Sequence, residues 1–285
     1  MTHKLILQAP DIATGDLKQL ARLSHARAIE AVQVAGLGHQ AFRLVDADPA
    51  SHEAVAAHCA AQAIDYAFMP ADTQLADVGL VVMDMDSTLI NIECIDEIAD
   101  GLGLKPQVAA ITERSMRGEI DFRQSLTERV ALLAGLEEAV LERVYTEKLR
   151  LNPGAELMLR TLHAAGAQSL LISGGFTFFT ERLRQRLGLS RAVANVLETS
   201  AGKLTGRLVG PMVDAETKAV ELESTRRHLG LGPGRVVALG DGANDLRMLA
   251  AADYGIAYHA KPVVQAQAAY AFNHIGLDGV LALFA

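Results

Sequence analysis

The chain has few cysteines, no surplus of positive charge and no long apolar run. Its only cysteines are Cys59 and Cys94, so a disulfide framework is not expected and a reducing compartment is favoured. The formal net charge of −8 argues against nucleic acid or an anionic membrane as the main partner. No stretch approaches the roughly 18 apolar residues that span a bilayer, and the run after Lys4 is too short for a signal peptide. These absences predict a soluble cytoplasmic protein, and a small anionic substrate is still possible because a few local cations or a metal can outweigh the net charge.

The composition is that of a globular protein, with 50% hydrophobic residues among 285. We predict two domains, residues 1–74 and 75–285, with a linker over 70–73. The first part reads as a small α+β unit with the βαββαβ order of ferredoxin-like modules. Its expected strands are 5–7, 31–34, 41–45 and 67–69, and its expected helices are 16–23 and 49–63.

The second part has the alternation of strands and helices that is typical of an α/β fold. An apolar strand over 80–83 comes first, and residues 94–150 then read as helices only. After residue 154 the expected strands are 169–172, 192–196, 236–239 and 254–256, and the expected helices are 155–165, 178–187, 217–228 and 243–250. This order predicts a Rossmann-like parallel sheet covered on both faces. The helical block, about 93–150, is then a cap inserted after the first core strand.

The strongest chemical signal is Asp84-Met85-Asp86-Ser87-Thr88, directly after the apolar strand. Sites in open α/β sheets form beyond the carboxyl ends of strands, so both acids can reach that crevice. One carboxylate can attack phosphorus and bind a metal, while the other transfers protons. Taken alone, the motif is also compatible with a turn that carries two solvated acids.

A second acidic motif, Gly240 to Asp245, follows the strand expected over 236–239. Asp241 stands at that strand end as Asp84 does at its own, and two such acids of one sheet can share a divalent cation. Hard oxygen ligands favour Mg²⁺. Asn244 and Asp245 are also common helix caps, an alternative that leaves Asp241 unexplained. Nine histidines without a close ligand-spaced pair make zinc unexpected.

Two further signals suit a phosphate group. The strand over 169–172 runs into Ser173-Gly174-Gly175, where a hydroxyl and backbone N–H groups near a helix start can bind an anion. Lys218 lies near the start of a helix, where the helix dipole disfavours a cation, and it can offset the charge of a phosphoryl group. An ordinary glycine turn and a surface lysine remain the alternatives for each signal alone.

Together the motifs resemble those of the phosphoserine phosphatases, a family of the haloacid dehalogenase superfamily. The resemblance covers about 78–285 and rests on 84–90, Glu93 and 95–99, on the cap residues 116–118, Phe122, 125–126 and 129–130, and on 240–245. The N-terminal unit is similar in position and element order to the ACT-like domains of some bacterial members. No glycine-rich ligand loop is evident at its first strand–helix junction, which leaves serine binding there open.

The resemblance implies a role for each matched residue. Asp84 is then the nucleophile and a metal ligand, and Asp86 is the general acid and base that also binds Mg²⁺ through its carbonyl. Asp241 is the third ligand, with Asp245 just behind it. Ser173, Gly174, Lys218 and Asn244 hold the phosphoryl group. Glu93 meets the substrate ammonium, Arg129 meets the carboxylate, and Met116 and Phe122 line the closed cap.

The function that this resemblance implies is hydrolysis of O-phosphoserine through an aspartyl-phosphate, the last step of serine biosynthesis. One alternative is a phosphatase or phosphotransferase of the same superfamily acting on another small phosphorylated metabolite. A second is a regulatory amino-acid-binding protein whose catalytic half is a remnant. Oligomeric state, including a homodimer, is left open. Residues 1–74 are expected to be dispensable unless a large apolar face joins the two parts.

Overall fold

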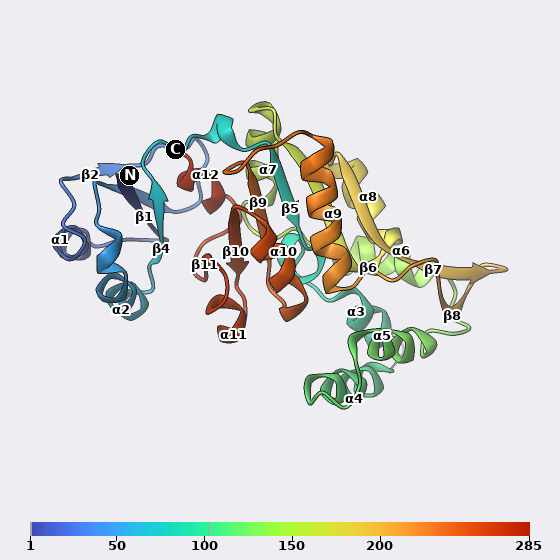
Figure 1. Ribbon diagram of the computed structural model, residues 1–285. Coiled ribbons are helices and arrows are strands. Elements are labelled where there is room, and N and C mark those ends of the chain that lie inside the picture. The colour runs from blue at the N-terminus through green and yellow to red at the C-terminus, as the bar shows by residue number, and fades with distance from the viewer. Residues whose placement is uncertain (1, 102) are drawn as a thin grey trace.

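A computed structural model describes residues 2–101 and 103–285, with the side chain of Met116 also outside the description. It contains two sheets. A four-stranded antiparallel sheet has the order β2-β3-β1-β4, and a seven-stranded sheet has the order β11-β10-β9-β5-β6-β7-β8 (Figure 1). The predicted parallel core with an α+β unit before it is therefore confirmed. No helix of the described ranges is both long and apolar enough to cross a membrane.

The N-terminal unit has the expected βαββαβ order. Its elements are β1 (His3–Ala9), α1 (Thr14–Leu23), β2 (Ala28–Ala31), β3 (Gln40–Val45), α2 (His52–Gln62) after a short 3-10 turn (Pro49–Ser51), and β4 (Asp65–Pro70). The strand expected over 31–34 lies three residues earlier, because Ala28 to Ala31 pair with Val45 to Phe42 of β3. Beyond it the chain turns away through Gly36, whose φ is +83°.

The sheet of the N-terminal unit is buried on both faces. Successive side chains of a strand point to opposite faces, and in β1 Leu5 and Leu7 pack with α1 and α2 while Ile6 packs with the second part of the chain. Met69 of β4 is buried on the same face as Ile6. A buried apolar face therefore joins the N-terminal unit to the rest of the chain. Whether residues 1–74 form a separate domain stays a prediction.

The core sheet is parallel except for its last strand. The parallel strands are β5 (Leu80–Met83), β6 (Gln168–Phe176), β7 (Arg191–Ser200), β9 (Val236–Gly240), β10 (Tyr254–Tyr258) and β11 (Tyr270–Phe272). β8 (Lys203–Val209) returns antiparallel to β7 and was not expected. The turn between them is Ala201-Gly202, both with positive φ, which matches a type I′ hairpin without the usual Asn-Gly signal.

Helices cover both faces of the core sheet, as predicted. One face packs against α7 (Ala155–Ala164), α8 (Thr177–Leu187) and α12 (Gly279–Leu283), and the other against α9 (Ala215–His228), α10 (Leu246–Ala251) and α11 (Pro262–Gln265). In β5, Val81 and Met83 belong to the first cluster while Leu80 and Val82 belong to the second. Neither β11, α11 nor α12 was expected.

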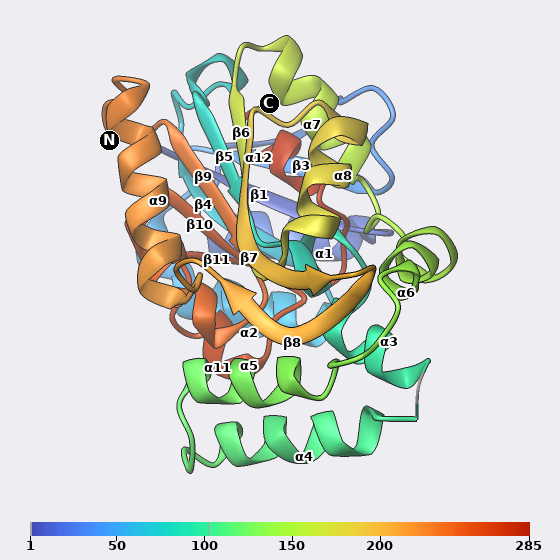
Figure 2. The same cartoon turned by 90° about the vertical axis from the view of Figure 1, so that its right-hand side faces the viewer.

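The predicted cap is the block of helices between β5 and α7. It comprises α3 (Cys94–Asp100), α4 (Lys105–Met116), α5 (Phe122–Ala131), α6 (Ala139–Arg143) and a π-helical turn (Val144–Lys148). Figure 2 shows α4 and α5 side by side, below the sheet. The two segments that connect the cap to the core pair antiparallel at Ile90 and Leu151, where Asn91 N donates to Arg150 O at 3.0 Å. The cap is therefore joined to the core by two short segments that are hydrogen-bonded to each other.

Candidate active site

The acidic residues of the two motifs follow neighbouring strands. β5 lies between β9 and β6, so Asp84, Asp241 and the Ser173–Gly175 segment meet at one edge of the sheet. Asp84 comes directly after β5 and Asp241 directly after β9. The carboxyl ends of adjacent parallel strands form the crevice in which α/β proteins place their sites. The sequence-based placement of these acids is what the fold produces.

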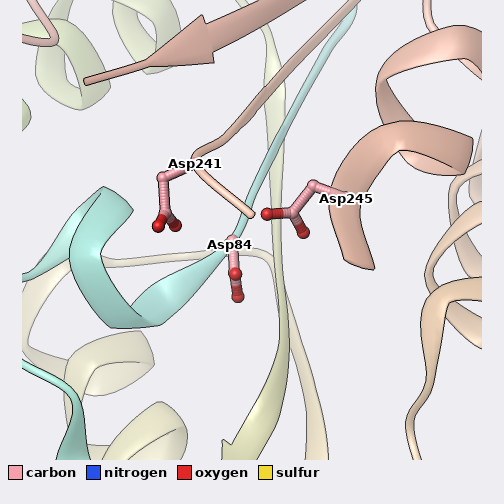
Figure 3. A group of neighbouring side chains, drawn as sticks. All are labelled: Asp84, Asp241 and Asp245. Atoms are coloured by element: carbon pink, nitrogen blue, oxygen red, sulfur yellow. The ribbon is translucent and has the colours of Figure 1, made fainter. Parts of the chain in front are cut away.

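Three carboxylates converge there, from Asp84, Asp241 and Asp245 (Figure 3). One oxygen of each lies within 4.8 Å of the others, and Asp84 and Asp245 are buried. Burial, with the nearby charge of Asp245, holds the pKa of Asp84 well above its usual range and raises the pKa of Asp241 to about 6. Buried like charges are costly unless a cation compensates them. The hard oxygen donors and their repulsion therefore fit a divalent cation.

Lys218 supplies one cation to this cluster. Its ammonium is buried, 2.9 Å from Asp84 Oδ1 and 2.7 Å from Asp245 Oδ1. Burial alone would lower the pKa of Lys218, but Asp245 and Asp84 together raise it above the usual value. Asp214 caps α9 by accepting from Thr217 N at 2.9 Å, which places Lys218 in the first turn. The structure thus has Lys218 in the site and not on the surface.

Asp245 occupies a different position from the other two acids. Its Oδ1 accepts from Lys218, and its Oδ2 accepts from Gly242 N at 3.0 Å. Both of its carboxylate oxygens are therefore engaged, and its expected place behind the metal ligands stays a prediction. Asp84 has a different pattern, because Met85 N and Lys218 both donate to Oδ1 and leave Oδ2 without a hydrogen bond among the described residues.

Thr88 and Ser87 are polar partners that the sequence analysis did not assign. Thr88 Oγ1 donates to Asp241 Oδ1 at 3.0 Å and is fully buried, so it orients that carboxylate. Ser87 has φ +55° and donates through Oγ to Glu93 Oε1 at 2.7 Å. Both belong to the motif after β5, at the first and second positions after Asp86, and their residue types alone do not reveal either contact.

The environment of Asp86 raises the pKa of its carboxyl group toward neutral pH. Its Oδ1 accepts from Cys94 N at 3.1 Å. Burial and the nearby Glu93 raise the pKa of Asp86 to about 7. Gly175 is needed beside it, because a Cβ there would lie 2.8 Å from Asp86 Oδ2. A carboxyl group with such a pKa can donate and accept protons at pH 7. Its predicted carbonyl contact to a metal stays a prediction.

The segment predicted to bind phosphate differs from expectation in one respect. β6 continues to Phe176 and α8 begins only at Thr177, so Ser173 and Gly174 belong to a strand end. Gly175 N donates to Ser173 Oγ at 2.8 Å and is therefore not a free donor. A bulge in the pairing with β7 opens this strand, and Asn195 Nδ2 donates to Gly174 O at 2.8 Å. Ser173 and Gly174 still line the cavity described next.

A cavity of about 710 Å³ joins the acid cluster to the cap. The predicted residues that line it are Asp84, Asp86, Glu93, Phe122, Arg129, Ser173, Gly174, Asp241 and Asn244. Phe122 of α5 covers Gly174, since a Cβ on that glycine would lie 3.2 Å from Phe122 Cζ. Met116 was also predicted to line the cap, but its side chain lies outside the described residues. The cap therefore touches the strand that holds Ser173.

Arg129 projects into this cavity without a close carboxylate partner among the described residues. Two nearby cap acids pair with other arginines instead: Glu128 with Arg114 at 2.7 Å and Glu119 with Arg117 at 2.7 Å. Burial lowers the pKa of Arg129 while Asp96 and Glu93 raise it. Burial raises the pKa of Glu93, while the hydrogen bond from Ser87 and the charge of Arg129 oppose that shift. A half-buried guanidinium and a carboxylate thus line one cavity.

Known proteins resemble the chain in sequence and in fold. The haloacid dehalogenase-like hydrolase family matches residues 81–250, and a domain of unknown function, DUF4072, matches residues 5–55. A phosphoserine phosphatase of Polaromonas sp. (strain JS666) is 52% identical over 217 residues, 74% of this chain and 92% of that relative.

Two solved structures extend the likeness over the N-terminal unit. A HAD family hydrolase of Salmonella enterica serovar Typhi has a TM-score of 0.90 at 32% identity and covers 100% of this chain and 99% of its own. An unliganded probable phosphoserine phosphatase of Vibrio cholerae has a TM-score of 0.83 at 39% identity, covering 99% of this chain and 86% of its own.

Proposed function

We propose, from the premise that the chain belongs to the haloacid dehalogenase-like hydrolases, that it is a phosphoserine phosphatase. It is an enzyme of the phosphatase class, and its sequence relatives bear that activity in name. The observation that carries the substrate is the pairing of Arg129 and Glu93 on one cavity with Asp84 and Asp241. O-phosphoserine has a carboxylate, an ammonium and a phosphate, and each meets a group of opposite or compensating charge.

Asp84 is the proposed nucleophile. Its Oδ1 is fixed by Met85 N and Lys218, which leaves Oδ2 to attack phosphorus. The new bond joins Asp84 Oδ2 to phosphorus while the bond from phosphorus to the serine oxygen breaks. Asp86 donates its proton to that leaving oxygen and then takes a proton from the water that attacks the aspartyl-phosphate. Phosphate leaves and Asp84 is restored, so serine and phosphate are the products.

Mg²⁺ is the cofactor we propose for the carboxylate cluster. Asp84, Asp241 and the Asp86 carbonyl are the proposed ligands, supported by the convergence of acid oxygens. The ion would neutralise charge on the phosphoryl oxygens and on its ligands. Ser173, Gly174 and Asn244 would position the phosphoryl group, and Lys218 would offset its charge.

Specificity is proposed to rest on the cap. A guanidinium can hold a carboxylate with two parallel hydrogen bonds, so Arg129 would read the serine carboxylate. Glu93, oriented by Ser87, would read the ammonium, with Phe122 and Met116 closing over the substrate. If the enzyme hydrolysed another phosphorylated metabolite, or transferred the phosphoryl group to an alcohol, the charges of Arg129 and Glu93 would have no partner on the substrate. If the chain were a regulatory amino-acid-binding protein with a remnant catalytic half, the intact cluster of acids would have no function.

The test is a substrate comparison on matched variants. Losing one charge partner in a closed site costs about 2–5 kcal/mol. Arg129→Ala should therefore lower kcat/KM for phosphoserine roughly 30- to 4,000-fold, and far less for phosphoethanolamine, which lacks the carboxylate. Arg114→Ala, which removes a cap arginine already paired with Glu128, is the control. An equal loss on both substrates would contradict the carboxylate clamp, and no turnover of any phosphorylated metabolite by wild type would contradict the phosphatase itself.

The wider setting is also proposed here. The enzyme would act in the cytoplasm, in the last step of serine biosynthesis, on a small substrate without nucleic acid or membrane. The N-terminal unit would be an ACT-like module, a proposal supported by its βαββαβ order and antiparallel sheet. A homodimer remains open to measurement by light scattering.

A further inference from the structure

A second cavity, of about 520 Å³, lies between the N-terminal unit and the core. Its wall takes His39 from the N-terminal unit, Ser87 and Asn152 from the segments near the first motif, and Tyr258, His274 and Asp278 from the C-terminal part. Of the residues that line it, only Ser87, which orients Glu93, has a role in the proposed reaction. Two buried titratable side chains in this wall, those of His39 and Asp278, lie close to one another.

His39 and Asp278 leave two hydrogen-bond acceptors at this cavity. The side chains are only 4% and 6% exposed, and His39 Nδ1 lies 3.9 Å from Asp278 Oδ1. His39 Nε2 is 2.8 Å from Gln8 Oε1, an oxygen that only accepts, so Nε2 carries the proton. Burial lowers the pKa of His39 and the charge of Asp278 opposes that shift; in the neutral ring that burial favours, Nδ1 is an acceptor.

Asp278 is used only in part by the protein. Its Oδ2 accepts from Gly38 N at 3.0 Å, whereas Oδ1 receives no hydrogen bond from the described residues. Asp278 lines the cavity, so an oxygen that receives no donor from the protein can accept a hydrogen bond from a ligand there. The hydroxyl of Tyr258, a residue only 2% exposed, also lacks a hydrogen bond within the described part of the chain. Burial and the charge of Asp278 raise the pKa of Tyr258 to about 12, so its hydroxyl stays neutral.

We propose that this cavity binds a small molecule through its primary ammonium group, held between His39 Nδ1 and Asp278 Oδ1. One nitrogen that makes hydrogen bonds of about 2.9 Å can reach two acceptors 3.9 Å apart. An ammonium has three donors, and Tyr258, which lines the same wall and feels the charge of Asp278, carries a further oxygen that can accept. Asp278 selects a cation over a neutral alcohol, and a guanidinium or a quaternary amine cannot place one N–H₃ group between these atoms.

The cavity borders the loop that carries the proposed nucleophile. Asn152 Nδ2 donates to Thr88 O at 2.8 Å and Ile90 O at 3.1 Å, and Ser87 Oγ donates to Glu93. A ligand in the cavity would contact the two residues that hold this loop. Binding of the ligand does not depend on the proposed function. An effect of the bound ligand on KM for phosphoserine would depend on it.

The binding test uses ethylamine as the probe, on the full chain, by calorimetry and thermal shift. Ethanol is the neutral control, and tetramethylammonium is the cation without N–H groups. Ethylamine should bind and raise the melting temperature, and neither control should. Glycine is added as a second source of primary ammonium, and tighter binding of glycine than ethylamine would show that a carboxylate is also recognised. Binding of ethanol or tetramethylammonium as strong as that of ethylamine would overturn the proposal.

Variants place the ligand. Asp278→Asn keeps an oxygen for Gly38 N and should weaken ethylamine binding roughly 10- to 150-fold, the cost of a hydrogen bond to a charged group. Tyr258→Phe removes only the hydroxyl and should weaken it several-fold, a second test should Asp278→Asn misfold. Asp72→Asn, at an exposed acid, should change nothing. Glu93→Gln removes the other carboxylate proposed to meet an ammonium, and binding retained there locates the ligand in this cavity. Loss in Glu93→Gln with no effect of Asp278→Asn or Tyr258→Phe would refute it.

Discussion

Removal of the N-terminal unit is predicted to destabilise the rest of the chain, because one face of its sheet packs against α12 and β11 of the core. Ile6 and Met69 are fully buried against the core, and Ala41 and Ala67 are nearly so. Polar bonds continue the contact, since Asp65 accepts from Asn273 N at 2.9 Å and His274 N at 2.8 Å. Residues 1–74 were expected to be dispensable only if no large apolar face joins the two parts. Such a face is present, so this condition is not met.

The magnitude follows from the buried side chains. At about 1.5–3 kcal/mol for a buried isoleucine or methionine and about 0.8 kcal/mol for each methyl group, the N-terminal side alone contributes roughly 4–8 kcal/mol. That is an upper figure, since unfolded chains already bury some surface, yet it is comparable with the total stability of about 5–15 kcal/mol of a folded protein. A protein made of residues 75–285 would also expose the partner face, including Phe284 and Leu281.

The assay compares residues 75–285 with the whole chain for solubility, thermal melting and phosphate release. We expect the truncated protein to aggregate or to melt at a much lower temperature. In the whole chain, Met69→Ala should cost about 2–5 kcal/mol and lower Tm by roughly 4–20 °C. Val220→Ala, at a side chain 52% exposed, is the matched control and should shift Tm very little. A soluble 75–285 protein with unchanged Tm and kcat/KM would refute the reasoning.

Three further predictions concern the site. Asp84→Asn should reduce kcat by several decades, because an amide is a poor nucleophile and a weak metal ligand; a tenth of wild-type kcat, with deamidation excluded, would rule out the covalent route. Activity should vanish in EDTA and return with Mg²⁺ but not Ca²⁺, whose longer bonds let Asp84 bind through both oxygens; full activity after EDTA would contradict the metal role. Gly174→Ala should lower kcat/KM roughly 10- to 100-fold by displacing Phe122, whereas Gly15→Ala, with open space around it, should not.

The sequence alone determined the layered fold and the strand-end acids. Apolar runs such as 80–83 and 236–239 are short, continuous and flanked by helices, which is typical of buried parallel strands. The carboxyl ends of such strands lie at one edge of the sheet, where Asp84 and Asp241 were expected; they meet because the fold makes β5 and β9 neighbours. The helical cap was equally local, because no strand pattern interrupts residues 94–150.

Contacts between distant segments were decided only by the tertiary structure. The apolar run of β1 indicates burial on both faces but does not say that Ile6 meets the core. The turn before β8 has only a weak sequence signal, and β8 forms because its backbone can pair with the free edge of β7. Whether Arg129 is paired depends on where α4 places Arg114, and the place of Asp245 depends on Lys218 of another helix. The facing acceptors of His39 and Asp278, 239 positions apart along the chain, exist only because the N-terminal unit packs on the C-terminal segment.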